Sequence, residues 1–290
     1  MSTNSKTKGI LYVLTAAMGF SLMTVFVRLA GDLPSFQKAF FRNFIALIFI
    51  CGLMIKNKVG FKVKKENRGY LFCRSFFGTL GLLCNFYAVD HLALADSNML
   101  NKLSPFFAII FSILLIKEIP DIFQIIGVTV AFIGALFIIK PGFSSAVTLP
   151  ALAGLLGGMG AGIAYTFVRM LGKRGESGPK IIFYFSAFSC IVCLPYLIFN
   201  YHPMTLKQTL CLLAAGAAAC VGQIGITRAY FYAPAKEISV YDYSQVVFAA
   251  LFGFLFFGQI PDVYSVVGYV LICGAGIAMF YYNKHRDRRQ

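Results

Sequence analysis

The sequence predicts an all-α polytopic membrane protein with ten transmembrane helices, arranged as two inverted five-helix repeats around a central cavity. Of its 290 residues, 59% are hydrophobic and 13% are charged, whereas a soluble domain of this length would be about a quarter charged. Ten apolar segments have about the 20 residues that a membrane-spanning helix needs. A set of matching residues also recurs at one constant offset, which indicates an internal repeat.

The ten apolar segments follow one another with short connections that leave no space for a soluble domain. They cover residues 9–29, 36–55, 69–89, 93–116, 121–139, 149–170, 180–199, 206–231, 236–257 and 263–282. The first segment follows a polar start and lacks a cleavage site with small residues. We therefore expect a retained helix rather than a cleaved signal peptide.

The net charge of +15 comes from Lys and Arg in the connections between apolar segments, where such residues set the topology. This placement argues against a nucleic-acid partner. The basic residues concentrate in the turn 56–68, the turn 173–180 and the tail 284–289, while the opposite connections hold little beyond Lys140 and Lys207. Both termini are therefore predicted to be cytoplasmic, in a multi-pass protein of the cytoplasmic (inner) membrane.

An internal repeat relates the two halves of the chain at an offset of 141 residues. The matched pairs are Gly19 and Gly160, Phe26-Val27-Arg28 and Phe167-Val168-Arg169, Asp121 and Asp262, and Gly127 and Gly268. The predicted repeats are residues 9–140 and 149–283. Each contains five spans, and because five is odd, the second copy must enter the membrane from the opposite side. An inverted repeat of this kind favours alternating access.

Polar residues interrupt the apolar segment 93–116 on one helical stripe, at Asn98, Asn101 and Lys102. Polar positions in the matching segment 236–257 are Ser239, Asp242, Tyr243 and Gln245. A cation at membrane depth costs roughly 2.5–3.5 kcal/mol and therefore faces a cavity or a partner. The pattern predicts a substrate site where the two repeats meet. The alternative is an internal Lys102–Asp242 pair that only holds the bundle together.

Further polar residues at membrane depth extend the predicted substrate site. They are Arg42, Arg74, Asn85, Tyr165, Gln223 and Arg228. Arg74 lies near the end of its helix, so its side chain either snorkels to the interface or points inward as an anion ligand. Arg42 and Arg228 carry the same ambiguity. Gly78 and Gly81, on the stripe that joins Arg74 to Asn85, are predicted to serve close helix packing.

No cofactor, metal site or catalytic residue is predicted. The eight cysteines lie in apolar segments, and the Cys190-x-x-Cys193 pair has no neighbouring His. No GxxxxGK[ST] loop is present to couple ATP. The three His lie in loops or the tail, which disfavours a membrane-embedded enzyme or lipid-handling protein. Asp96 and Asp242 are the candidates for proton coupling.

Several motifs carry a resemblance to a known family. They are AFFRN at 39–43, RSFFG at 74–78, the run LALADSN…LSPFFAIIFSILLIKE from Leu92 to Glu118, and a second copy that ends in GQIPD. In these the chain resembles the EamA type of the drug/metabolite transporter superfamily over nearly its whole length. It departs from the motif at Gln259, where the first copy has Glu118.

The resemblance implies ten helices in two inverted repeats, with a cavity lined mainly by the first, third, fourth, sixth, eighth and ninth. It also implies metabolite transport, since members export amino acids or other metabolites and some relatives take up S-adenosylmethionine, riboflavin or carboxylates. Arg42 and Arg74 lie in the helices that look most like the carboxylate and S-adenosylmethionine branches.

Cations outnumber carboxylates at membrane depth, which predicts a secondary transporter for a small organic metabolite that bears an anionic or carboxylate group. The alternative within transport is an exporter of cationic or aromatic compounds that uses Asp242 and the tyrosines. The expected partners are this small molecule and the lipid bilayer, and the sequence is compatible with a homodimer.

Overall fold

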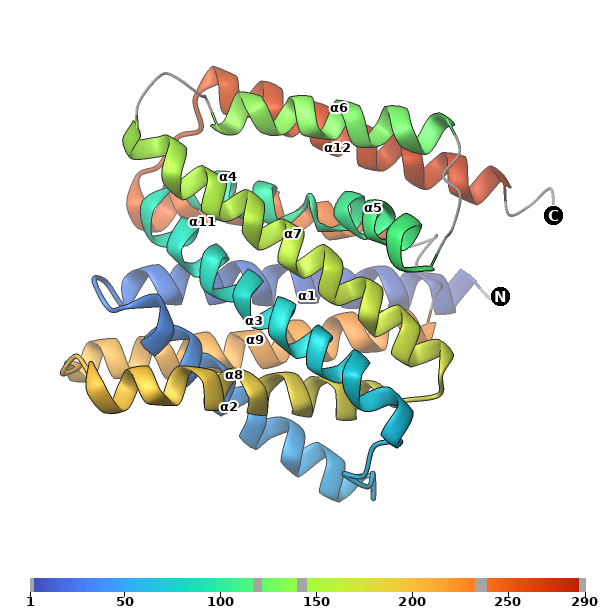
Figure 1. Cartoon of the computed structure of the whole chain (residues 1–290). Coiled ribbons are helices and arrows are strands. Elements are labelled where there is room, and N and C mark those ends of the chain that lie inside the picture. The colour runs from blue at the N-terminus through green and yellow to red at the C-terminus, as the bar shows by residue number, and fades with distance from the viewer. Residues whose placement is uncertain (1–2, 117–121, 140–144, 233–238, 287–290) are drawn as a thin grey trace.

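The computed structural model is a bundle of helices and describes residues 3–116, 122–139, 145–232 and 239–286 (Figure 1). The helices are α1 (Thr3–Leu29), α2 (Ser35–Lys56), η1 (Lys65–Asn67), α3 (Arg68–His91), α4 (Leu94–Asn101), α5 (Ser104–Ile116), α6 (Ile122–Ile139), α7 (Ser145–Lys173), α8 (Gly178–Phe199), α9 (Leu206–Tyr232), η2 (Ser239–Tyr243), α11 (Ser244–Phe257) and α12 (Val263–Arg286). Within these ranges no strand occurs. Seven helices are long and apolar enough to cross a membrane, namely α1, α2, α3, α7, α8, α9 and α12.

The remaining apolar helices are shorter, and the predicted segment 93–116 shows why. It forms two helices, α4 and α5, instead of one. Between them the Leu103 amide bonds the Leu100 carbonyl at 3.2 Å, which is the tighter spacing of a 3₁₀ turn. The cause is Pro105, which has no amide hydrogen and whose ring would clash with the carbonyl of Asn101 in a continuous helix.

The matching segment 236–257 is irregular at the same place. Here the 3₁₀ helix η2 passes into α11 between Tyr243 and Ser244, which are the positions 141 residues after Lys102 and Leu103. Residues 233–238, including Pro234 and the start of this predicted segment, lie outside the described residues. Two discontinuous helices therefore occupy matching places in the two halves of the chain.

Close-packed pairs of helices form the middle of the bundle, with α1 along α9 and α3 along α7. Glycines allow the close approach. A Cβ atom built on Gly19 would lie 2.8 Å from the backbone nitrogen of Gly222, and one on Gly160 would lie 2.9 Å from the Cα of Gly81. These contacts confirm that Gly81 serves helix packing. The pair α6 and α12 covers one flank of the bundle, and α2 and α8 cover the other (Figure 1).

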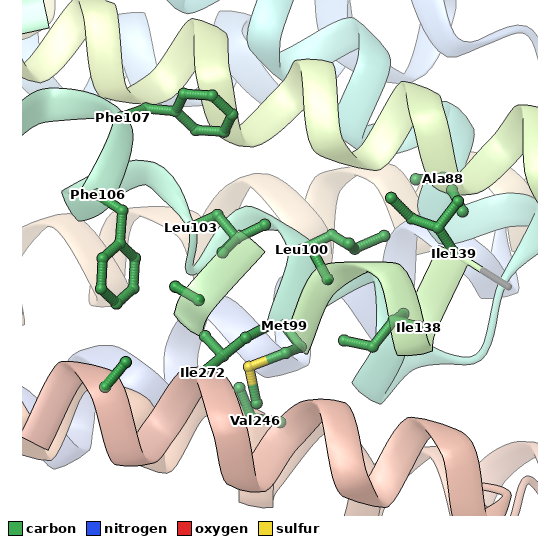
Figure 2. Close-up of a cluster of buried hydrophobic side chains, with 14 of the residues drawn as sticks. Ala88, Met99, Leu100, Leu103, Phe106, Phe107, Ile138, Ile139, Val246 and Ile272 are labelled. Carbon is green, nitrogen blue, oxygen red and sulfur yellow. The ribbon is translucent and has the colours of Figure 1, made fainter. Parts of the chain in front are cut away.

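A cluster of apolar side chains packs against the interrupted helix formed by α4 and α5 (Figure 2). Leu100, Leu103 and Phe106 around the α4–α5 junction are at most 1% exposed and belong to one buried cluster with Ile138 of α6 and Ile272 of α12. Because lipid tails are as apolar as leucine, this cluster stabilises through close packing rather than through transfer out of water. The polar side chains of the junction are thus carried on a firmly packed element.

The beginning of α1 and the end of α12 lie at the same end of the bundle (Figure 1), which we call the termini end. The 56–68 connection and the turn between α7 and α8 meet at this end, where Lys180 donates a hydrogen bond to the Lys62 carbonyl at 3.0 Å. The opposite end, which we call the far end, carries the turn at Gly31 and the connection from α3 to α4. Gly31 has φ +68, a conformation that suits glycine.

Candidate functional site

An ion pair joins the two discontinuous helices. Lys102, at the end of α4, donates to Asp242 of η2 with an Nζ–Oδ2 distance of 2.5 Å. The two side chains are 10% and 32% exposed, so the carboxylate is the more accessible partner. The internal pair that the sequence left as an alternative is therefore present. The pair lies at two helix breaks, and broken helices in membranes commonly gather polar groups at binding sites.

Hydrogen bonds next to this ion pair join α1, α4 and α11. The amide of Gln245 donates to Asn98 Oδ1 at 2.6 Å, and Asn98 Nδ2 donates to the Leu94 carbonyl at 2.7 Å. Ser21 on α1 donates to the Gln245 carbonyl at 2.9 Å. Asn98 and Gln245 are 3% and 7% exposed, so the structure brings these two predicted site residues together as a buried contact.

Tyr165 of α7 lies near the ion pair. Its side chain is 53% exposed, although it lies within a spanning helix. Its hydroxyl interacts electrostatically with Asp242 of η2, Arg74 of α3 and Arg42 of α2. Charged groups from three other elements thus lie near its hydroxyl, as expected for a side chain that faces the inside of the bundle rather than lipid.

Arg74 points into the bundle, so the snorkelling alternative is wrong for this residue. Its guanidinium lies along α3 against Gly78, one turn further from the helix start at Arg68. The Cζ atom sits 4.4 Å from the ring centroid of Phe185 on α8, a cation–π geometry. Gly78 therefore does not serve helix packing alone, because any side chain there would collide with the guanidinium.

Arg42 is 4% exposed and is oriented by a chain of hydrogen bonds. Its Nη1 donates to Asn43 Oδ1 at 2.6 Å, and Asn43 Nδ2 donates to Ser189 of α8 at 2.9 Å. The Nε atoms of Arg42 and Arg74 are buried without a hydrogen-bond partner. Within the described residues neither arginine has a carboxylate within ion-pair distance.

Other predicted site residues lie around this centre. Asn85 is buried against Gly157 of α7, and its Oδ1 has no partner. Asn101 is partly exposed, and its side chain makes no hydrogen bond to the described residues. Gln223 is partly exposed on α9. Arg228, near the termini end, is exposed and donates to the Tyr12 hydroxyl at 3.3 Å.

Two predicted residues contact α12. The Tyr243 hydroxyl lies against Gly276, which has no side chain to obstruct it. Asp96 accepts a hydrogen bond from the Tyr269 hydroxyl at 2.6 Å. The side chains of Ser239 and Arg169 lie outside the described residues. Among the residues that are described, no cluster of three His, Cys, Asp or Glu could hold a metal.

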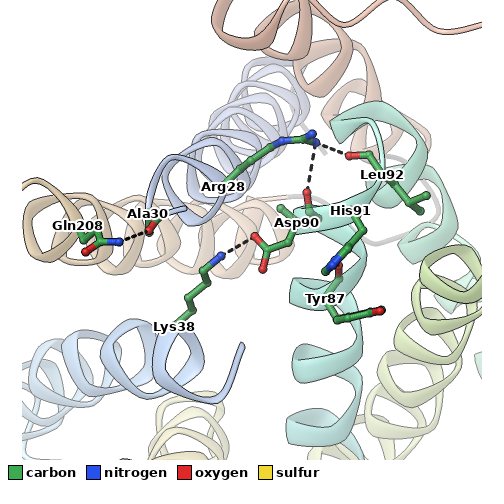
Figure 3. Close-up of polar contacts among 9 residues, drawn as sticks. Arg28, Ala30, Lys38, Tyr87, Asp90, His91, Leu92 and Gln208 are labelled. Carbon is green, nitrogen blue, oxygen red and sulfur yellow. Dashed lines mark hydrogen bonds and ion pairs between the residues drawn. The ribbon is translucent and has the colours of Figure 1, made fainter. Parts of the chain in front are cut away.

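A second buried ion pair, at the far end, was missed from the sequence (Figure 3). Lys38 of α2 donates to Asp90 of α3 at 2.6 Å, and the Lys38 side chain is 0% exposed. Arg28 of α1 donates to the carbonyls of Val89 and Leu92, so α1, α2 and α3 are tied together. A lysine next to a helix start is typical of an ordinary interfacial residue, and the sequence signal for Lys38 was therefore weak.

The termini end is held by contacts between loops. Asn67 donates to Glu176 at 2.9 Å, and this hydrogen bond lowers the pKa of the Glu176 carboxyl. Arg174 lies with its Cζ 4.1 Å from the ring centroid of Tyr70 and donates to its hydroxyl. These contacts join the 56–68 connection and the start of α3 to the turn between α7 and α8.

Comparison with known proteins settles the family. The profile of the EamA-like transporter family matches the chain twice, over residues 7–140 and 148–282. The chain belongs to the EamA-like transporter family. The predicted resemblance is thus confirmed, and this EamA protein is a multi-pass membrane transporter whose partners are a small-molecule substrate and membrane lipid.

Full-length relatives of this EamA protein come from bacteria and animals. The pseudopaline exporter CntI of Pseudomonas aeruginosa is 36% identical over 93% of this chain and 95% of its own length. Human solute carrier family 35 member G1 is 25% identical over 93% of this chain and 78% of its own. The riboflavin transporter of Vibrio cholerae is 24% identical over 88% of this chain and 86% of its own.

A solved crystal structure shares the fold of the EamA chain. It superimposes with a TM-score of 0.67 at 14% identity and covers 98% of this chain and 99% of the other. The likeness extends over nearly the whole length of both chains.

Proposed function

We propose that this protein is a secondary transporter that moves a small organic metabolite with an anionic or carboxylate group across the cytoplasmic membrane by alternating access. The observation that carries the proposal is the Lys102–Asp242 ion pair, which joins two discontinuous helices beside an interior space. A pair of interrupted segments at matching positions in two halves is the pattern that marks substrate sites in transporters built from inverted repeats.

Contacts at one offset support the inverted repeat, with repeats at 9–140 and 149–283. The contact between Gly19 and Gly222 has its counterpart 141 residues on in the contact of Gly160 with Gly81. Gly160 is the repeat equivalent of Gly19, and Gly222 is the repeat equivalent of Gly81. The repeat therefore converts one contact into the other, as a two-fold axis between the halves requires. An axis in the membrane plane would let the halves exchange shapes and open the cavity to either side in turn.

The bundle is proposed to be open toward the termini end, which is the cytoplasmic side. Tyr165 is exposed in the part of α7 near this end, whereas the far end is tied by Lys38, Asp90 and Arg28. The excess of Lys and Arg in the connections at the termini end supports a cytoplasmic location for both termini.

The substrate's charge and direction follow from the polar groups and from the relatives. Arg42 and Arg74 provide two positive charges near Tyr165 that no described carboxylate neutralises. Export is supported by the similarity to the Pseudomonas relative, which is a pseudopaline exporter. Asp242, which is more exposed than Lys102, is proposed to take up the coupling proton, with Asp96 as the second candidate.

Replacing Lys102 with Met tests the proposal. The uncharged side chain leaves Asp242 without its partner, and we expect transport to be lost while the protein still folds and inserts. The readout is export of labelled metabolites from loaded membrane vesicles, first with a panel of amino acids, carboxylates and nucleoside-like cofactors to find a transported compound. Lys207→Met, at an exposed position in α9, is the control. Unchanged transport by Lys102→Met would refute the role of the ion pair.

The greater exposure of Asp242 favours one second candidate, an exporter of cationic or aromatic compounds. That function predicts that Asp242→Asn loses binding of a quaternary amine while Lys102→Met retains it. The same panel of compounds, extended with quaternary amines, separates the two candidates.

A further inference from the structure

Two arginines near Tyr165, Arg42 and Arg74, are incompletely hydrogen-bonded. Arg42 is 4% exposed, and the Nε atoms of both Arg42 and Arg74 are buried without a partner. Each arginine at membrane depth is costly, roughly 2.5–3.5 kcal/mol on insertion scales. A buried donor without a partner adds a further cost of about 1–3 kcal/mol. A ligand that accepts hydrogen bonds from these guanidinium groups would offset this free-energy cost.

The protein holds both guanidinium groups in place without neutralising them. Arg42 is oriented by Asn43, which is itself fixed by Ser189 at 2.9 Å. Arg74 is stacked on Phe185 and lies in the space that Gly78 leaves open. Amide, aromatic and glycine neighbours position a guanidinium but bring no negative charge, so the two arginines repel one another in the absence of an anion.

The two arginines and Tyr165 lie within electrostatic reach of one another. Each guanidinium interacts electrostatically with the Tyr165 hydroxyl, and Arg42 also interacts with Arg74. Lys102 differs from both, because its charge is already matched by Asp242 at 2.5 Å. The positive charge that is free to bind a ligand therefore belongs to the arginine pair and not to the lysine.

From this arrangement we infer that Arg42 and Arg74 together bind an oxyanion group of the transported molecule, in a subsite separate from the Lys102–Asp242 pair. Guanidinium groups present paired N–H donors that match the geometry of carboxylate and of phosphate. This inference rests on the proposed transport function and names the part of the substrate that the cavity recognises.

Binding to the purified full chain in detergent tests the subsite. The probes are succinate and inorganic phosphate, with succinamide as the uncharged analogue and choline chloride as the ionic-strength control. We expect an oxyanion at a hundred times its dissociation constant to raise the melting temperature by about 5 °C, because it binds only the folded state. Succinamide and choline chloride should leave it unchanged. A response to succinate alone identifies a carboxylate, and a response to phosphate alone identifies a phosphate group.

Matched variants locate the binding. Arg74→Gln should lose the shift, whereas Arg68→Gln should keep it, since Arg68 begins the same helix and is exposed. Arg42→Gln should also lose the shift. If Arg42→Gln or Arg74→Gln fails to fold, chemical protection of the two arginines in the wild-type protein is measured instead. Succinate or phosphate should then shield Arg42 and Arg74 from phenylglyoxal, an arginine reagent, as mapped by mass spectrometry.

The outcomes separate the subsite from the proposed function. A shift that survives in Arg74→Gln and Arg42→Gln but disappears in Lys102→Met overturns the arginine subsite and leaves the anion transporter in place. If no oxyanion shifts the wild-type protein while quaternary amines do, the subsite and the anionic substrate are both wrong.

Discussion

At the scale of single residues, the protein keeps several charges away from water by different means. Lys38 and Asp90 neutralise one another, Lys102 is paired with Asp242, and Arg74 is stacked on an aromatic ring. Pairing within the chain stabilises a fold, whereas a charge left without a counter-ion is a reason to look for a ligand. The arginines and the lysines thus have different roles in the same bundle.

The Lys38–Asp90 pair makes a prediction at this scale. Lys38→Met removes the cation and leaves a partly buried carboxylate alone, which should lower the free energy of unfolding by about 3 kcal/mol. Thermal unfolding in detergent measures the change. The double variant Lys38→Met/Asp90→Leu should recover much of the loss, because it leaves no unpaired charge. A single variant as stable as the wild type would show that the pair does not hold the far end.

The candidate site was predictable from sequence only as a set of residue types at membrane depth. Lys102 and Asp242 were both named, and their ion pair was one of the two alternatives drawn from the matching segments 93–116 and 236–257. Lys38 and Asp90 were not named, since nothing in the sequence relates a position early in one helix to a position late in the next. The orientation of the Arg74 side chain was also undecided, because it depends on Phe185, which is distant in the sequence.

At the scale of helices, the glycine contacts decide how closely the central pairs approach. Gly160→Ala should push α7 away from α3, because its Cβ would lie 2.9 Å from the Cα of Gly81. Overpacking of this kind typically costs about 1–3 kcal/mol. Gly172, on the same helix, has no heavy atom within 4 Å of a built Cβ atom, so Gly172→Ala is the matched control. It should be neutral or stabilise the helix by about 0.5–1 kcal/mol.

Unfolding midpoints of the two variants check this prediction. If Gly160→Ala is as stable as Gly172→Ala, the glycine contact does not set the approach of α3 and α7. Gly19→Ala tests the matching contact of α1 with α9 and should behave as Gly160→Ala does.

Helix existence was more predictable than helix continuity. All of the predicted segments contain helix in their described residues, because about 20 apolar residues in lipid must satisfy their backbone internally. The segment 93–116 was predicted as one span, with Pro105 as a candidate position for a kink. The structure shows a break there, because the loss of one amide donor and a clash with the preceding turn outweigh the apolar character of the segment.

At the scale of the whole molecule, we propose a bundle that is tied at the far end and opens toward the termini end. The closure is made by Lys38, Asp90 and Arg28, and Tyr165 lies exposed on the other side of the ion pair at the helix breaks. Alternating access requires that this residue be reached from one side at a time.

Labelling of a cysteine at position 165 tests this central claim most directly. The variant Tyr165→Cys is made in a chain whose eight native cysteines are replaced by Ala. A membrane-impermeant maleimide is applied to inside-out vesicles and to intact cells. We expect labelling from the cytoplasmic side only, and labelling from the opposite side as well once Lys38→Met/Asp90→Leu loosens the far end. Failure to label from either side would contradict a central cavity, and equal labelling from both sides without those substitutions would contradict alternating access.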